Sequence, residues 1–355
     1  MDIATFTQIL QIAFEKKVSD IHFEVDHPPI FRARGHLVRA KLNNLTAQDT
    51  EFIARTVMEQ HNRSLPENIR EFDTSYMLPN VGRFRVSIFR QRGHIGIVIR
   101  VIPHYIGTFD ELHLPEALAK IAQAPNGLIL VTGPTGNGKS TTLASMVRYI
   151  NENYSYNIIT IEDPIEFLFT SAKSCIIQRE VGLDTESFSG ALRAAMRMDP
   201  DVIMVGEMRD HETIDACIKA AETGHLVLST LHTNNAASTI NRMVSHFPPE
   251  SQEIVRHRLA EILVATVSLR LVRDKSGENV LPVSEVMYTT STIKACIRDG
   301  NLDELEEHIE KGRDEYHMQS LDQHLIQLCR QDIISLDEAK RVSRSSDLER
   351  KLMYY

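Results

Sequence analysis

One stretch of the sequence combines glycines, a lysine and hydroxyl side chains at a spacing suited to binding phosphate groups. It follows the apolar run 128–131 and reads Gly133, Pro134, Thr135, Gly136, Asn137, Gly138, Lys139, Ser140 and Thr141. Glycines let such a loop curl until its backbone N–H groups point at phosphate oxygens, and a helix that begins after it adds its positive dipole end. Lys139 can reach the β- and γ-phosphates of a nucleotide, and the Ser140 hydroxyl can ligate Mg²⁺. This pattern between a strand and a helix predicts a site for ATP or a similar nucleotide.

Two acidic clusters follow consecutive apolar runs farther along the chain. Glu162, Asp163 and Glu166 come after the first of these runs, and Glu207 comes after the second. Carboxyl ends of parallel strands gather at the ligand crevice of an open sheet. Carboxylates there could line the nucleotide site, position a water or hold Mg²⁺. The alternative, loop charges that face solvent, is less favoured because two clusters end consecutive strands.

Two histidines, His225 and His232, flank the apolar run 226–230. They could sense a γ-phosphate or contact a neighbouring subunit, although histidines in such positions are more often structural. No further zinc ligands stand nearby at a suitable spacing. The sequence therefore predicts no metal other than Mg²⁺.

The pattern of apolar residues predicts two domains joined by a linker. Residues 1–102 combine helical spacing with short alternating strands, which indicates a small α+β unit. Prolines and a lack of periodicity indicate a linker at 103–115. In residues 116–355, short apolar runs alternate with helix-length segments, which favours an α/β fold with a mostly parallel sheet. From residue 248 onward the pattern predicts mainly helices.

The composition excludes several classes of protein. The chain has 355 residues, 42% of them hydrophobic, and a formal net charge of −9. At roughly 150 residues per domain this length predicts about two domains, and the acidity disfavours a protein that coats nucleic acid. No apolar run approaches the roughly 20 residues of a membrane-spanning helix, and the amino terminus lacks the pattern of a signal peptide. The widely spaced cysteines, Cys175, Cys217, Cys296 and Cys329, fit a reducing cytosol better than a disulfide framework or a zinc knuckle.

Together these segments resemble the secretion ATPases of type IV pili and type II secretion. The phosphate-binding loop (133–141) is followed by an acidic box (161–166), a Walker B element (201–210) and a histidine box (224–233), in the order and spacing of that superfamily. Within it, the sequence is most similar to the pilus retraction ATPases of the PilT/PilU group. The resemblance implies a RecA-like P-loop ATPase domain with a helical carboxyl-terminal part, preceded by a smaller PAS-like domain.

The resemblance also implies a role for individual side chains. Glu166 would be the general base for the attacking water, and Glu207 would act on Mg²⁺ through its waters. His225 and His232 would be the pair of the histidine box that borders the nucleotide, with His232 close to the γ-phosphate. Arg85 and Arg100 of the first domain would neutralise phosphate charge. Without the resemblance, the favoured interpretation of these arginines is a strand face exposed to solvent.

The implied function is that of a hexameric ATP hydrolase that powers type IV pilus retraction and twitching motility. It would act on an inner-membrane platform protein at the cytoplasmic face of the membrane, together with a paralogous retraction ATPase, and without nucleic acid. Three alternatives stay open: a pilus or type II secretion assembly ATPase, a RecA-like nucleic-acid motor, and a poorly hydrolysing accessory subunit. The absence of a four-cysteine motif and of an extra amino-terminal domain disfavours the first, and the acidic and histidine boxes disfavour the second.

Overall fold

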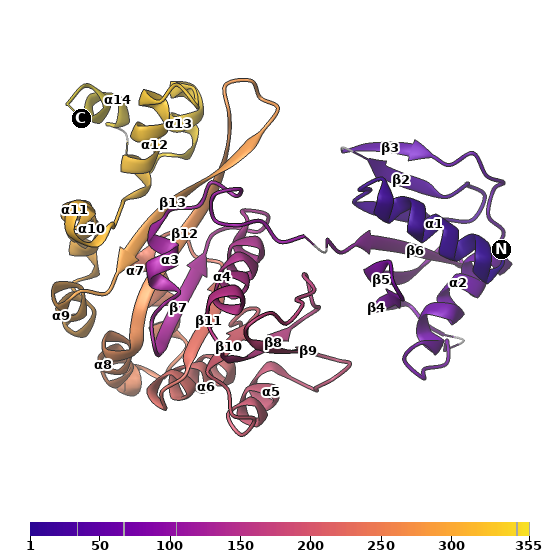
Figure 1. The fold of residues 1–355 in the computed structure, drawn as a ribbon, viewed down its shortest axis with the longest axis horizontal. Coiled ribbons are helices and arrows are strands. Elements are labelled where there is room, and N and C mark those ends of the chain that lie inside the picture. The colour runs from indigo at the N-terminus through magenta and orange to yellow at the C-terminus, as the bar shows by residue number, and fades with distance from the viewer. Residues whose placement is uncertain (34, 67, 104, 346, 355) are drawn as a thin grey trace. The chain divides into compact units, whose positions relative to one another are not determined.

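The described chain divides into two compact units (Figure 1). The computed structural model describes residues 1–33, 35–66, 68–103, 105–345 and 347–354, so His104 of the expected linker lies outside the described residues. Unit 1 comprises Met1–Tyr105 and Pro164–Phe169, and unit 2 comprises Ile106–Asp163 and Thr170–Tyr355. The division after Tyr105 falls within residues 103–115. The segment Pro164–Phe169 packs with unit 1.

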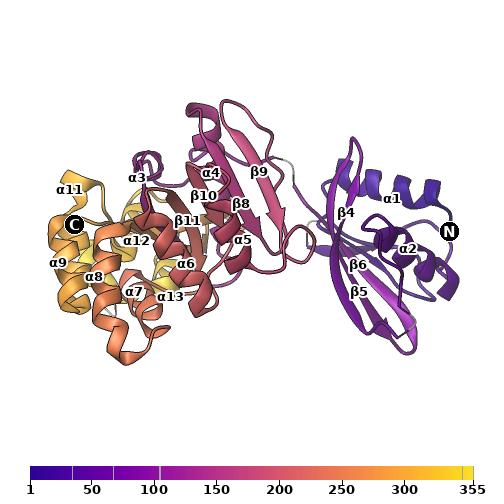
Figure 2. The same ribbon diagram turned by 90° about the horizontal axis from the view of Figure 1, so that it is seen from below.

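Unit 1 is an antiparallel sheet with two helices on one face. The sheet order is β3-β2-β1-β6-β5-β4. Its elements in chain order are α1 (Ile3–Glu15), β1 (Asp20–Phe23), β2 (Ile30–Ala33), β3 (His36–Arg39), α2 (Ala47–Glu59), β4 (Glu71–Leu78), β5 (Gly82–Gln91) and β6 (His94–Val101). Figure 2 shows α1 and α2 on the same side of the sheet.

Alternation along β5 explains the two faces of this sheet. Phe84, Val86 and Ile88 are fully buried in a core that α1 and α2 help to form, because alternate residues of a strand point to opposite faces. The residues that alternate with them, including Arg83 and Arg85, lie on the other face and are only partly buried. The sheet therefore presents arginines on the face opposite its hydrophobic core.

Unit 2 is built around a mixed sheet of order β13-β12-β7-β11-β10-β8-β9, in which the pairs from β12 to β9 are parallel and β13 is antiparallel to β12. Its first half contains α3 (Ala117–Ile121), β7 (Gly127–Thr132), α4 (Lys139–Asn153), β8 (Asn157–Glu162), β9 (Cys175–Glu180), α5 (Phe188–Ala195), β10 (Val202–Val205), α6 (His211–Glu222) and β11 (Leu226–Leu231). Its second half contains α7 (Ala236–Ser245), η1 (Pro249–Ser251), α8 (Gln252–Ile262), β12 (Leu263–Arg273), β13 (Val280–Tyr288), α9 (Ser291–Asp299), η2 (Leu302–Glu304), α10 (Leu305–Lys311), α11 (Arg313–Tyr316), α12 (Leu321–Arg330), α13 (Leu336–Val342) and α14 (Leu348–Tyr354).

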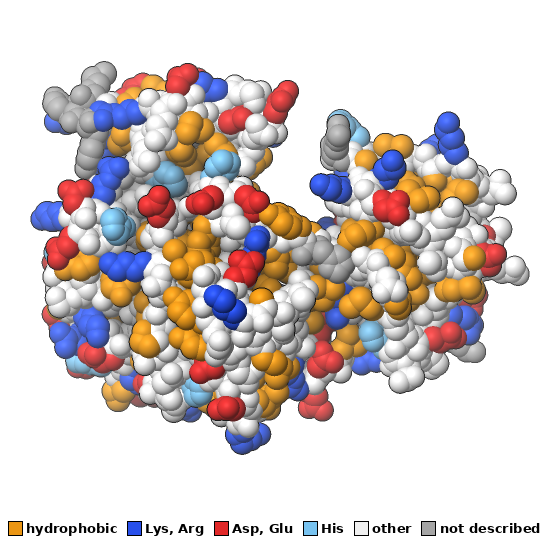
Figure 3. All heavy atoms as spheres, in the orientation of Figure 1, with side chains coloured by type: hydrophobic (Ala, Val, Ile, Leu, Met, Phe, Trp, Pro, Cys, Tyr) orange, Lys and Arg blue, Asp and Glu red, His pale blue; other side chains and the backbone are white. Residues whose placement is uncertain are grey.

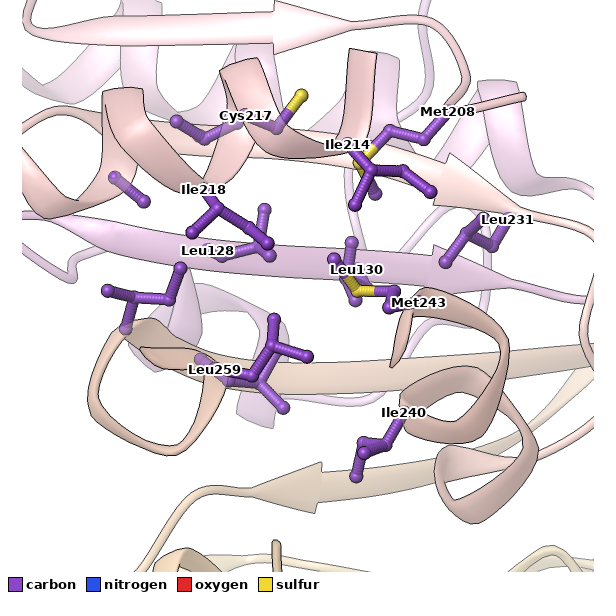
Figure 4. Close-up of a cluster of buried hydrophobic side chains, with 14 of the residues drawn as sticks. Leu128, Leu130, Met208, Ile214, Cys217, Ile218, Leu231, Ile240, Met243 and Leu259 are labelled. Carbon is purple, nitrogen blue, oxygen red and sulfur yellow. The ribbon is translucent and has the colours of Figure 1, made fainter. Parts of the chain in front are cut away.

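The core of unit 2 fixes β7 in the middle of the sheet. Leu128 and Leu130 of β7 are fully buried and pack in one cluster with Ile214 and Ile218 of α6 and with Met243 of α7 (Figure 4). Full burial of an aliphatic side chain contributes roughly 1.5–3 kcal/mol to stability. The loop after β7 therefore starts from a rigid base, and the predicted α/β class is confirmed.

The strand pair β12 and β13 corrects one expectation. The sequence from residue 248 onward indicated mainly helices, but Leu263–Arg273 and Val280–Tyr288 form a long antiparallel pair, and β12 also pairs in parallel with β7. Along residues 265–270 of β12, apolar and polar side chains alternate, which is the period-two pattern of a strand. The expectation of a helix overlooked this signal.

The surface of the protein mixes side chains of different kinds. Figure 3 shows acidic, basic and apolar side chains interspersed on the face in view. Within the described residues, no helix combines the length and the apolar character needed to cross a membrane.

Candidate nucleotide site

The phosphate-binding loop runs from the carboxyl end of β7 to the first turn of α4. Gly133 has a φ of 144°, and a Cβ added there would lie 2.6 Å from the carbonyl oxygen of Leu269 on β12, so a larger residue does not fit. Gly136 and Gly138 have φ values of 78° and 81°, which glycine adopts at little cost. Gly138 is the N-cap of α4 and supplies no side-chain acceptor to the first N–H groups of that helix. The loop thus presents backbone N–H groups and a positive helix end to an anion.

Lys139, the first residue of α4, turns its ammonium back onto the loop. Nζ donates to the carbonyl oxygens of Gly133 (2.9 Å) and Pro134 (3.0 Å), and it lies 3.4 Å from Nδ1 of His232. The residue is only 8% exposed. A buried ammonium requires acceptors on several sides, and the loop provides them. Ser140 and Thr141 follow in the first turn of α4 and are partly buried.

From His232 a row of side chains of alternating charge leads away from the loop. His232 Nε2 lies 3.4 Å from Glu207 Oε2, Glu207 Oε1 pairs with Arg209, and Arg209 Nη1 lies 3.9 Å from Asp163 Oδ2. Because Lys139 can only donate, Nδ1 of His232 accepts, and its proton is therefore assigned to Nε2, which faces the carboxylate. Hydrogen bonding to Glu207 raises the pKa of Arg209. Arg209 therefore remains charged.

Parallel strands bring these residues together. Asp163 follows β8, Glu207 follows β10 and His232 follows β11, and the three strands are neighbours in parallel register. The segment after β10 is held against β11, since Thr230 Oγ1 donates to the carbonyl oxygen of Gly206 over 2.7 Å. The carboxyl ends of these strands therefore gather Asp163, Glu207 and His232 in one place.

The rest of the acidic box separates into two environments. Glu162 is buried at the end of β8, where Oε1 accepts from Thr160 Oγ1 (2.7 Å) and Gln178 Nε2 (3.3 Å). These bonds hold its carboxylate within the sheet. Glu166 belongs to the segment Pro164–Phe169 of unit 1.

The other predicted site residues lie outside the cluster around Lys139. His225 precedes β11, and its Nδ1 contacts the carbonyl oxygen of Ala220 (2.9 Å) and Thr223 Oγ1 (3.1 Å) in the preceding turn. The six residues of β11 place it about 20 Å from His232 at roughly 3.3 Å per residue. Arg85 and Arg100 are cross-strand partners in the sheet of unit 1. Arg100 donates to Asp20 over 2.9 Å.

Hydrogen bonds fasten the loop to β12 and, through it, to the end of the chain. Asn137 Oδ1 accepts from the backbone N–H of Leu271 (2.9 Å). Below the loop, Thr132 Oγ1 donates to Ser268 Oγ (2.9 Å), and Ser268 Oγ donates to Glu285 Oε1 (3.3 Å). The other oxygen of Glu285, a residue 2% exposed, pairs with Arg344. We call the series Thr132, Ser268, Glu285 and Arg344 the anchor chain.

Sequence reasoning missed Arg209 and the anchor chain. Arg209 stands two residues after Glu207, so its proximity to that carboxylate was a usable signal. The members of the anchor chain are far apart in sequence and carry no joint motif. Only the pairing of β12 with β7 and β13 brings Thr132, Ser268 and Glu285 together.

His232 lies beside Lys139 and His225 does not, so alanine variants of the two histidines form a matched pair for an ATPase assay. We expect His232→Ala to lower kcat on the order of ten- to a hundredfold, because it removes the side chain between Lys139 and Glu207. His225→Ala should change kcat by less than about threefold, since the imidazole of His225 hydrogen-bonds to Ala220 and Thr223 in the turn before β11, away from Lys139. Equal losses in the two variants would contradict this division of roles.

The chain matches known proteins over nearly its whole length. The model of the type II/IV secretion system protein family matches residues 3–346. The type IV pilus retraction ATPase PilT of Pseudomonas aeruginosa is 41% identical over 97% of this chain and 98% of its own length. The type IV pilus ATPase PilU of the same organism is 40% identical over 94% of this chain and 87% of its own length.

A solved structure agrees with the sequence comparisons. The crystal structure of the pilus retraction motor PilT with bound ADP is 43% identical and has a TM-score of 0.90, with 99% of each chain covered. The predicted resemblance to the secretion ATPases is confirmed. With its strand–loop–helix phosphate site and a family match from residue 3 to residue 346, the chain belongs to the type II/IV secretion system protein family.

Proposed function

We propose that this protein hydrolyses ATP to power the withdrawal of type IV pili, and with it twitching motility. The observation that carries the proposal is the meeting of Lys139, His232 and Glu207 at the carboxyl ends of the sheet. A phosphate-binding lysine, a side chain that can sense a γ-phosphate and a carboxylate are the parts needed for phosphoryl transfer to water. The similarity to a retraction motor that binds ADP supports the same activity here.

The residues present fit ATP with Mg²⁺. The backbone of residues 133–138 and the ammonium of Lys139 would hold the phosphates, and Glu162 and Asp163 would border the site. The hydroxyl of Ser140 and the carboxylate of Glu207 are the hard oxygen donors that Mg²⁺ prefers. When bound, Mg²⁺ neutralises charge on the β- and γ-phosphates. Glu207 would act through Mg²⁺-bound waters while His232 keeps its carboxylate oriented toward the loop.

Three further side chains carry the catalytic part of the proposal. Glu166 is the general base that accepts a proton from the attacking water, a role worth roughly 10²–10⁴-fold in rate. Arg85 and Arg100 neutralise charge that develops on the phosphates. His225 is assigned to contacts with a neighbouring subunit, because its position at the amino end of β11 separates it from Lys139.

The proposal includes the assembly and the partners of the motor. The chain forms a homohexamer at the cytoplasmic face of the inner membrane. Its hydrolysis cycle acts on the platform protein of the pilus, and a paralogous retraction ATPase works beside it. No nucleic acid takes part.

A second candidate function is that of an accessory subunit that hydrolyses ATP poorly. One observation favours it: the chain is 41% identical to PilT and 40% identical to PilU, so overall identity does not place it with either paralogue. An assembly ATPase with the opposite output is a third candidate, which shares the same site chemistry.

Turnover of the purified protein and the phenotype of a deletion strain test the proposal together. We expect Mg²⁺-dependent ATP hydrolysis without added paralogue, and pili that persist unretracted in the deletion strain. Hydrolysis that requires the paralogue would support the accessory role instead. A deletion strain without pili would identify an assembly motor and contradict retraction.

A further inference from the structure

A cysteine, a glutamate and a histidine from three successive elements converge outside the nucleotide site. Cys296 lies on α9, Glu304 ends η2, and His308 lies on α10. Their ligand atoms, one from each side chain, all lie within 4.8 Å of one another, and His308 Nε2 is 3.9 Å from Glu304 Oε2. Within the described part of the chain this is the one group of three such side chains that meets this distance.

The local fold explains the convergence. Cys296 is 6% exposed and points with Ile293 and Ile297 toward the core of unit 2. Gly300 ends α9 with a φ of 80°, a left-handed conformation that reverses the chain. Glu304 and His308 are four residues apart across the start of α10, so their side chains share one face. The turn at Gly300 brings that face to Cys296.

The donor atoms are those of a zinc site. Thiolate sulfur, imidazole nitrogen and carboxylate oxygen are the three ligand types that Zn²⁺ binds, at about 2.3, 2.0 and 2.0 Å. Tetrahedral coordination at those lengths puts neighbouring ligand atoms about 3.3–3.5 Å apart. The present separations, up to 4.8 Å, require a contraction of up to about 1.5 Å to reach those spacings, which rotation of the partly exposed His308 and the exposed Glu304 can supply.

We propose that Cys296, Glu304 and His308 bind one Zn²⁺ ion, with the fourth position open to water or to a ligand from outside the chain. The thiolate and the carboxylate balance the charge of the ion, and His308 binds as a neutral donor. The bound ion joins α9 to α10 across the turn at Gly300. This site is independent of ATP hydrolysis and revises the expectation that no metal other than Mg²⁺ binds.

The sequence did not show this site because its spacing follows the fold. Seven residues separate Cys296 from Glu304, and the zinc motifs recognised from sequence instead pair cysteines or histidines two to five residues apart. The short interval from Glu304 to His308 carries no metal signal by itself, since such pairs are common on exposed helices.

Titration of the untagged, full-length protein with Co²⁺, in the absence of nucleotide and Mg²⁺, tests the proposal. Co²⁺ takes the tetrahedral geometry of Zn²⁺ and reports a thiolate ligand through a charge-transfer absorption. We expect one tightly bound Co²⁺ per chain with that absorption, and its displacement by Zn²⁺. Cys296→Ser should abolish the absorption, and His308→Ala should weaken binding at least tenfold.

Two control variants and a measurement of the unfolding temperature show whether the bound Co²⁺ is at the proposed site. Cys329→Ser, at a partly buried cysteine, and His94→Ala, at an exposed histidine of unit 1, should bind Co²⁺ as the unmodified protein does. Zn²⁺ should raise the unfolding temperature of the unmodified protein and of Cys329→Ser, but not that of Cys296→Ser. Absence of the thiolate absorption in the unmodified protein, or its persistence in Cys296→Ser, would overturn the proposal.

Discussion

Lys139→Ala is expected to reduce ATP turnover on the order of a thousandfold. The ammonium of Lys139 is the buried cation of the loop, with Gly133 and Pro134 as its backbone acceptors. Its removal deletes the charge that would meet the β- and γ-phosphates, where charge-assisted hydrogen bonds in a water-poor site count most. The measurement is kcat and the affinity for a fluorescent ATP analogue, both of which should fall.

Lys219→Ala is the matched control for that experiment. Lys219 is an exposed lysine of unit 2 that pairs with Asp215 on the same helix, so its loss should leave turnover within about twofold. A Lys139→Ala protein that is folded by circular dichroism and retains more than a tenth of the normal turnover would show that the loop does not hold the reacting nucleotide.

Glu166→Gln is expected to separate binding from chemistry. The substitution preserves the size of the side chain and one acceptor oxygen but removes the carboxylate that accepts a proton from water. Turnover should therefore fall roughly 10²–10⁴-fold while affinity for ATP stays within about threefold. Single-turnover hydrolysis with radiolabelled ATP measures the first quantity, and equilibrium binding of a fluorescent analogue measures the second.

Two further variants test whether the loss of turnover in Glu166→Gln comes from the loss of a general base. Glu186→Gln changes an exposed carboxylate of unit 2 and should be silent. Glu207→Gln should raise the Mg²⁺ concentration needed for half-maximal turnover, a change that Glu166→Gln should not produce. Normal turnover in Glu166→Gln would remove Glu166 from the mechanism, and an altered Mg²⁺ requirement would move it to the metal.

Local patterns in the sequence were enough to predict the secondary structure of the central part of unit 2. The glycines and Lys139 predicted a phosphate-binding loop between a strand and a helix, and β7 and α4 occupy those places. Short apolar runs likewise predicted β8, β10 and β11, because parallel strands buried on both faces are continuous in their hydrophobicity. The roles of Glu166, Arg85 and Arg100 remain predictions.

The features that could not be predicted from the sequence depend on contacts between residues that are far apart along the chain. His225 and His232 look equivalent beside the same strand, but only the residue at its carboxyl end can meet a loop that follows a parallel neighbour. The strand β12, by contrast, was not concealed: apolar and polar residues alternate along residues 265–270, and the expectation of a helix overlooked that pattern. The site of Cys296 arises from a turn whose geometry is invisible in the spacing of its ligands.

The anchor chain gives unit 2 a mechanical property. Thr132 and Arg344 are far apart along the polypeptide, but three hydrogen bonds and ion-pair contacts join them through Ser268 and Glu285. A pull on the carboxyl-terminal segment is therefore transmitted to the base of the phosphate-binding loop by side chains, without passing through the intervening helices. The stiffness of the loop is therefore set partly by Arg344, a residue that lies far from the loop in the sequence but only three contacts from its base.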